Sequence, residues 1–213
     1  MVEQIVDLKL PLSAEQAREL KLGQMVTVSG LLFTGRSRFH IRTIENNIIP
    51  PLDYEKINCF FHVGPVMKQN AQGQWEIVSI EPTSSIRFER YSADVIRKLK
   101  LHVLIGKTTM GPATSQALAE VGGVHLTKIG ICGNQLSAQV KKVHEVHFLE
   151  ELGKTEATWV FAVEKLGPFF VDMDASGNNY FSNLNKQVVN NIEALSTRLG
   201  ISKDYKFTNV DAE

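Results

Sequence analysis

The sequence has 213 residues, 43% of them apolar, and a formal net charge of zero. A neutral chain has no general electrostatic attraction for nucleic acid or for an acidic membrane surface. No apolar run approaches the roughly 20 residues of a membrane span, and the N-terminus has no cationic and apolar leader, so we expect a cytoplasmic protein that binds neither nucleic acid nor membrane.

The first half of the chain is rich in Val, Ile and Phe. Four runs predict strands, at 5–10, 25–33, 59–67 and 75–80. Between the first two, Ser13 and Gln16 have the spacing of a capping box, and Gly23 follows as a stop signal. These signals predict a short helix over 14–20.

In the second half, amphipathic segments of helix length alternate with short apolar runs. The pattern predicts helices over 93–100, 112–121, 135–143 and 184–199, and strands at 101–105, 124–126, 158–163 and 169–173. Such alternation indicates βαβ units. The expected fold class is therefore α/β, a mixed sheet with flanking helices, in a domain over 1–180 followed by a C-terminal helical extension over 181–213.

Cationic residues follow several predicted strands, where side chains of α/β folds usually meet ligands. Arg36 comes after Gly35, which permits a tight turn; an ordinary surface arginine is the alternative. Thr83-Ser84-Ser85, followed by Arg87, is a donor-rich turn that suits an anion. The same hydroxyls could instead cap a helix N-terminus, and the two interpretations are compatible.

Lys107 follows a predicted strand and Gly106, which partly resembles a phosphate-binding loop. Leu101 stands where that loop needs its first glycine, so nucleotide binding is not predicted. A lysine at this position still suits a carboxylate, because its ammonium group is a compact point charge.

No metal site is predicted in this chain. Cys59 and Cys132 are its only cysteines, too few for a cluster that needs three or four thiolates. His144 and His147 are one residue short of the zinc-protease spacing, which predicts ordinary histidines.

Six motifs occur in a fixed order along the chain. They are Thr34-Gly35-Arg36 with His40; Val63-Gly64-Pro65-Val66-Met67; Pro82-Thr83-Ser84-Ser85-Ile86-Arg87-Phe88-Glu89; Ile105-Gly106-Lys107 with Met110-Gly111-Pro112; Val146-His147-Phe148-Leu149-Glu150-Glu151-Leu152-Gly153 with Trp159; and Asp174 with Gly177-Asn178-Asn179. In this order they resemble the C-terminal domains of class I (iron–sulfur) fumarases and the β subunits of L(+)-tartrate dehydratases. The similarity runs from about Leu10 to Tyr180.

This resemblance implies a swivelling β/β/α domain that docks on a larger, cysteine-bearing α subunit, and hence a hetero-oligomer. In that family three cysteines of the larger part hold a 4Fe-4S cluster, so the cofactor would belong to the partner. By position, Arg36, Arg87 and Lys107 match residues that bind substrate carboxylates, and Thr83 matches the hydroxyl residue proposed as catalytic base. The implied activity is reversible hydration of a C4 dicarboxylate, fumarate to malate; the alternatives are L(+)-tartrate dehydration and a non-catalytic relative that kept the fold.

The chemistry of the residues agrees with these roles. A dicarboxylate brings two negative charges and gains more when a proton leaves beside a carboxylate, so several fixed cations are needed. A threonine hydroxyl is a poor base unless nearby cations favour its alkoxide. Two departures stand out: Ser37 replaces a common Asp, and Thr108-Thr109 replaces two glycines. We expect the first to free Arg36 from a carboxylate partner and the second to stiffen the loop.

Overall fold

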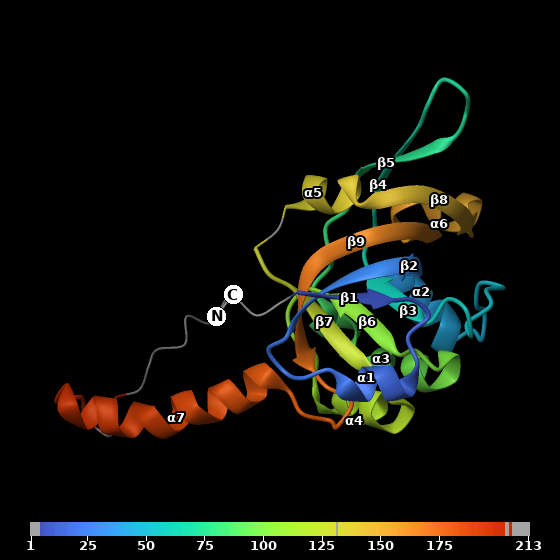
Figure 1. Cartoon of the computed structure of the whole chain (residues 1–213). Helices are drawn as coiled ribbons and strands as arrows, with labels where there is room; N and C mark the ends of the chain where they lie inside the picture. The colour runs from blue at the N-terminus through green and yellow to red at the C-terminus, as the bar shows by residue number, and fades with distance from the viewer. Residues whose placement is uncertain (1–4, 131, 203–204, 206–213) are drawn as a thin grey trace. The chain divides into compact units, whose positions relative to one another are not determined.

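A computed structural model describes residues 5–130, 132–202 and 205 of the chain (Figure 1). It divides into two compact units, Met1–Asn179 and Tyr180–Glu213. The first unit holds a mixed seven-stranded sheet with flanking helices, which confirms the α/β class expected from the sequence. All the predicted site residues belong to this unit.

The strands are β1 (Val6–Lys9), β2 (Met25–Gly35), β3 (Cys59–His62), β4 (Val66–Gln69), β5 (Trp75–Ser79), β6 (Val103–Gly106), β7 (Val124–Lys128), β8 (Val140–His147) and β9 (Thr158–Met173). The helices are α1 (Ala14–Glu19), α2 (Ser37–Ile44), the 3₁₀ helix η1 (Ser85–Phe88), α3 (Glu89–Leu99), α4 (Pro112–Val121), α5 (Gly133–Ala138), α6 (Leu149–Glu156) and, in the second unit, α7 (Tyr180–Arg198). The predicted capping box of Ser13 and Gln16 begins α1, with both reciprocal hydrogen bonds formed.

The strand order of the large sheet is β1-β2-β3-β6-β7-β9-β8, and β4 and β5 form a separate hairpin. Strands β2, β3, β6 and β7 are parallel, so their carboxyl ends meet at one edge. Strand β9 runs antiparallel to both β7 and β2, which closes five strands into a ring of pairings. Two residues of β9, Lys165 and Gly167, have positive φ angles of 50° and 132° that interrupt its regular extended backbone.

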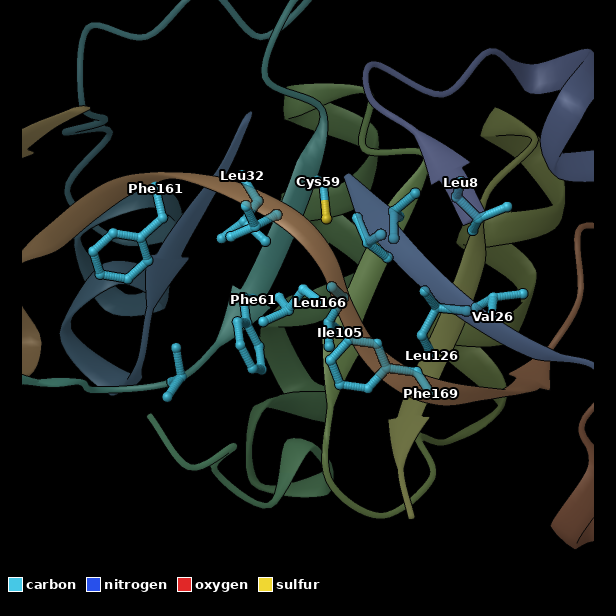
Figure 2. Packing of buried hydrophobic residues seen from close by; sticks show 14 of the residues in the cluster. Leu8, Val26, Leu32, Cys59, Phe61, Ile105, Leu126, Phe161, Leu166 and Phe169 are labelled. Atoms are coloured by element: carbon cyan, nitrogen blue, oxygen red, sulfur yellow. The ribbon is translucent and has the colours of Figure 1, made fainter. Parts of the chain in front are cut away.

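The interior of this ring is apolar. Figure 2 shows side chains from several strands converging there, among them Phe61, Ile105, Leu126, Phe161 and Phe169. Cys59 belongs to the same core and is fully buried. Burial of these apolar side chains stabilises the ring of strands, and the candidate site residues follow the ends of strands in this ring.

A second core lies on the helix-covered face of the sheet. It joins Phe33 and Phe60 of the strands to Phe39 of α2, Ile96 of α3 and Leu118 of α4. Phe33 and Phe60 stack with their ring centroids 4.7 Å apart.

Four predicted elements are wrong in extent or type. The run 59–67 is two strands, because Gly64 and Pro65 interrupt it; a Cβ on Gly64 would lie 2.5 Å from the Thr155 carbonyl oxygen. The helix expected over 135–143 ends at Ala138, and the following residues form β8 against β9. The two strands expected at 158–163 and 169–173 are one continuous β9.

The second unit contains α7, which begins four residues before the predicted helix. Its apolar side chains Leu184, Val188, Ile192 and Leu195 are exposed at the spacing of one helix face. None of the helices in the described part of the chain is both long enough and apolar enough to cross a membrane.

Candidate active site

The candidate site lies at the carboxyl edge of the parallel strands. Gly35 of β2 is in register with His62 of β3, and Gly106 of β6 is in register with Thr127 of β7. The chain leaves β2 at Arg36 and β6 at Lys107. Because β3 separates these two strands and neighbouring strands lie about 4.8 Å apart, the backbones of the two cationic residues are roughly 10 Å apart.

The turn that carries Thr83 is held between β3 and β6. The Thr83 amide donates to the His62 carbonyl oxygen over 2.7 Å, and the Ser85 amide donates to the Lys107 carbonyl oxygen over 2.8 Å. Ser84 also forms a parallel bridge with Lys107. The structure therefore brings Thr83 and Lys107 together at adjacent strand ends.

The hydroxyls of Thr83 and Ser84 are available to a ligand. Both residues are half-buried, and among the described residues neither hydroxyl has a hydrogen-bond partner. Ser84 is the N-cap residue of η1, yet its side chain makes no capping bond. The helix-cap alternative therefore does not account for these hydroxyls.

Arg87 and Lys107 carry charges without a carboxylate partner among the described residues. Arg87 is exposed on η1. Its amide lies 3.4 Å from the Ser84 carbonyl oxygen, so Arg87 lies one 3₁₀ turn after Ser84. Lys107 is half-buried beside Ser84. Unpaired cations beside free hydroxyls suit an anionic ligand.

Arg36 is the N-cap residue of α2 and is not free of a carboxylate. Its Nη1 lies 3.8 Å from Oε1 of Glu156 in α6, and the other carboxylate oxygen accepts from the Arg38 amide over 2.9 Å. The expectation that Ser37 leaves Arg36 without such a partner is wrong, because a residue more than a hundred positions later supplies the carboxylate. The Nε atom of Arg36 is buried and has no partner among the described residues.

The loop after Lys107 is strained at the position where the resemblance favours glycine. Thr108 has a φ of 67°, a left-handed conformation that β-branched residues rarely adopt. Its carbonyl oxygen accepts from the Thr127 hydroxyl over 3.1 Å, and the Thr109 hydroxyl accepts from Asn179 over 2.8 Å. These contacts hold the loop in place.

A further pair of charges at this edge escaped the sequence analysis. Lys128 is the last residue of β7, the strand next to β6, after which Lys107 follows. The ammonium group of Lys128 lies 2.6–2.7 Å from both carboxylate oxygens of Glu81. The Lys128 side chain is only 10% exposed. The strand-end rule that selected Lys107 would also have found Lys128.

Three fully buried histidines, His40, His62 and His125, lie near the carboxyl edge of the sheet. No sequence signal marked His62 or His125. His40 Nδ1 lies 2.8 Å from the Arg36 carbonyl oxygen, His62 Nδ1 2.9 Å from the Ser85 hydroxyl, and His125 Nδ1 2.6 Å from the Asp172 carboxylate.

Burial lowers the pKa of His40 to about 4. Burial, followed by the nearby His40 and His125, lowers the pKa of His62 well below its usual value. Because desolvation disfavours the charged imidazole, His40 and His62 are neutral at physiological pH. They serve this edge as hydrogen-bonding groups rather than as charges.

The thiols of this chain do not fit an iron–sulfur cluster. Cys59 is buried in the ring interior, where desolvation raises the pKa of its thiol, whereas Cys132 is exposed at the start of α5. In the described part of the chain, no three His, Cys, Asp or Glu side chains are grouped as metal ligands. His144 and His147 lie in β8, and His147 Nε2 contacts Glu145 over 2.9 Å.

A cavity of about 480 Å³ lies at the opposite, amino-terminal edge of the sheet. Its lining includes Leu12, Tyr54, Leu99 and His102. None of the predicted site residues lines it, so it is not the candidate active site.

Comparison with known proteins gives a consistent picture. Residues 2–184 match the family described as Fumarase C-terminus. The chain is 33% identical over 172 residues to the L(+)-tartrate dehydratase subunit beta of Escherichia coli, covering 81% of this chain and 84% of that protein. It is 33% identical over 187 residues to a protein of Methanocaldococcus jannaschii provisionally named as the same subunit, covering 86% and 95% of the two chains.

A longer relative is also similar. The chain is 35% identical over 182 residues to a protein of Geobacillus stearothermophilus provisionally named fumarate hydratase class I. The match covers 85% of this chain but only 34% of that protein. The chain therefore spans about a third of the length of this relative and most of the length of the two named as separate subunits.

Proposed function

This chain belongs to the fumarase C-terminal family, and from that premise we propose that it is the β subunit of a hydro-lyase that reversibly hydrates a C4 dicarboxylate. The observation that carries the proposal is the arrangement of the 83–85 turn between His62 and Lys107. That turn sets the Thr83 and Ser84 hydroxyls beside Lys107, all without side-chain partners among the described residues, with Arg87 and Arg36 on flanking segments. Coverage of most of the length of the two β-subunit relatives supports a separate subunit.

In this proposal, Arg36, Arg87 and Lys107 bind the two substrate carboxylates. Their positive charges stabilise the negative charge that develops when a proton leaves the carbon beside a carboxylate. Thr83 takes that proton as its alkoxide, which the cations around it favour, and the hydroxyl so formed returns the proton in the reverse direction. The roughly 10 Å between the Arg36 and Lys107 backbones leaves room for both side chains to reach a four-carbon ligand.

We assign the 4Fe-4S cluster to cysteines of a partner α subunit, because the two thiols of this chain do not fit it. The active enzyme would then be a hetero-oligomer, and this chain alone would be inactive.

Fumarate and malate are the proposed substrate pair, and tartrate is the second candidate because two of the similar proteins carry that name. A non-catalytic subunit that kept the fold is the alternative from a different class. A binding or regulatory relative would also use such cations to hold an anion, so activity of the reconstituted complex decides between the two.

The test is reconstitution with a candidate α subunit under anaerobic conditions. Absorbance of a thiolate-ligated cluster, at roughly 400 nm, should appear only when the partner is present. Assays on malate, fumarate and both tartrate enantiomers should then give a highest specificity constant for malate or fumarate. A highest value for tartrate would replace the substrate and keep the reaction class. A cluster-loaded complex without activity on any of these substrates would favour the non-catalytic alternative. A stoichiometric cluster on the lone chain would refute the assignment of the cluster to a partner subunit.

A further inference from the structure

A buried hydrogen bond behind the site joins two residues that no part of the proposed mechanism uses. His62 and Ser85 are both fully buried, and His62 Nδ1 lies 2.9 Å from the Ser85 hydroxyl. Ser85 also donates its amide to the Lys107 carbonyl oxygen, while the His62 carbonyl oxygen accepts from the Thr83 amide. Each partner in the buried bond therefore also makes a backbone contact with a proposed site residue.

We infer that His62 and Ser85 are positioning residues, whose buried side-chain hydrogen bond holds the 83–87 segment against Lys107. This inference rests on the proposed function only in taking Thr83 and Lys107 as the groups that meet substrate. A displacement of about 1 Å at a reacting group can cost roughly 10²-fold in rate, so a contact that fixes this turn is expected to affect turnover.

The surroundings of the bond leave little freedom to either side chain. The His62 ring packs edge-on against Phe60 and Phe88, with centroids 4.9 Å away in each case. A Cβ on Gly106 would lie only 1.7 Å from the Ser85 hydroxyl oxygen, so the absence of a side chain there is what admits the serine. The strand glycine and the packed rings together fix the geometry of the hydrogen bond.

The electrical state of His62 suits a positioning role. Burial and the two neighbouring histidines keep its pKa low, so the ring is neutral. A neutral imidazole can either donate to or accept from the serine hydroxyl, and it adds no charge that would compete with Arg87 and Lys107 for an anion.

The test compares variants that break the bond with variants that spare it. Ser85→Ala removes the hydroxyl, and His62→Leu removes the ring nitrogen. His62→Asn places an amide near the former Nδ1 and can restore the bond to Ser85. Ser92→Ala is the matched control, since Ser92 is equally buried and bonds the Phe88 carbonyl oxygen outside this turn.

The first readout is amide hydrogen exchange of the purified chain, which needs neither substrate nor partner. Ser85→Ala and His62→Leu should each raise the exchange rates of the Thr83 and Ser85 amides by about fivefold or more, the equivalent of one ordinary hydrogen bond. His62→Asn and Ser92→Ala should stay close to the unaltered chain. The double variant Ser85→Ala with His62→Leu should exchange no faster than the worse single variant, because both changes remove the same contact.

The second readout is turnover by the reconstituted complex. Ser85→Ala and His62→Leu should lower kcat by about tenfold or more and change KM less, and His62→Asn should recover most of the loss. Exchange rates and kcat within about twofold of the unaltered protein in folded Ser85→Ala and His62→Leu would overturn the inference. If the unaltered complex had no hydro-lyase activity, the proposed function would fail, and the exchange rates would still decide whether these side chains hold the turn.

Discussion

The ammonium group of Lys128 lies 2.6 Å from a carboxylate oxygen of Glu81, at the end of the strand beside Lys107. The carboxylate neutralises a nearly buried cation close to the proposed dicarboxylate site. We expect Glu81→Gln to release that positive charge and to lower KM for the dicarboxylate by about two- to fivefold, in line with the modest energies of partly exposed ion pairs.

This effect should weaken as salt is raised, because exposed charges are screened. The control is Glu76→Gln, which breaks the exposed Lys68–Glu76 pair in the β4–β5 hairpin and should leave KM unchanged. An unchanged or higher KM in Glu81→Gln would exclude Lys128 from the electrostatics of the site.

Gly106 must lack a side chain, since a Cβ there would lie 1.7 Å from the Ser85 hydroxyl oxygen and 3.2 Å from His125 Nε2. Gly106→Ala should therefore lower the free energy of unfolding by about 1–3 kcal/mol, the usual cost of overpacking. Adding Ser85→Ala removes the closest atom and should restore part of the loss. Denaturant unfolding of the unaltered chain and of these two variants measures both effects. An unchanged stability in Gly106→Ala would show that Ser85 can move aside at no cost.

Local sequence signals predicted much of the fold. The capping box of Ser13 and Gln16 begins α1, and Pro112 opens a helix that ends at Val121, as its pattern indicated. These features depend on neighbouring residues alone. The helix expected over 135–143 failed because Val140 and Val143 pair with the distant β9, and tertiary pairing outweighs a local helical pattern.

Part of the site was also predictable from local sequence signals. Lys107 and Arg36 each come directly after a strand, and a strand end can be read from the sequence. The Glu156 carboxylate near Arg36 and the Asp172 partner of His125 come from chain positions far away, so spacing gives no sign of them. Buried histidines such as His62 were missed because the sequence does not reveal whether a polar residue within an apolar run is enclosed by the fold.

Stability should fall on mild acidification. Burial lowers the pKa of His40 from 6.5 to about 4 in the folded chain, so between these pH values the unfolded chain binds more protons than the folded one. Lowering the pH through this window therefore favours unfolding, by up to about 1.4 kcal/mol per pH unit for each such group.

Replacing His40 isolates its contribution. His40→Asn can still donate to the Arg36 carbonyl oxygen but cannot titrate. Between pH 4 and 6.5, the slope of unfolding free energy against pH should therefore fall by nearly the contribution of one proton, about 1.4 kcal/mol per pH unit. His144→Asn, which replaces an exposed histidine of β8, is the matched control. Equal slopes in the original chain and in His40→Asn would mean that His40 titrates normally in the folded state.

Arg87 and Lys107 should act on binding and on chemistry together. Their charges attract the dicarboxylate in the ground state and hold it more tightly as negative charge builds. Arg87→Ala and Lys107→Ala should each raise KM and lower kcat, with a loss of about 2–4 kcal/mol in transition-state stabilisation. Lys56→Ala, on the exposed Asp53–Lys56 pair, is the control. Unchanged kinetics in either site variant would remove that cation from the site.

Replacing Thr83 should affect the kinetics differently from replacing these cations, because the proposed role of Thr83 is proton transfer. Thr83→Val keeps a β-branched shape and removes no formal charge, so substrate binding should change little while kcat falls by about 10²–10⁴-fold. Solvent-isotope exchange at the malate methylene should fall in parallel, since the same hydroxyl moves that proton in both directions. Thr27→Val makes the same replacement at a half-buried threonine that bonds Asp7, and it should leave both rates unchanged. A folded, cluster-loaded Thr83→Val complex with near-normal kcat would assign the proton transfer to another group and leave Thr83 as part of the turn that carries Arg87.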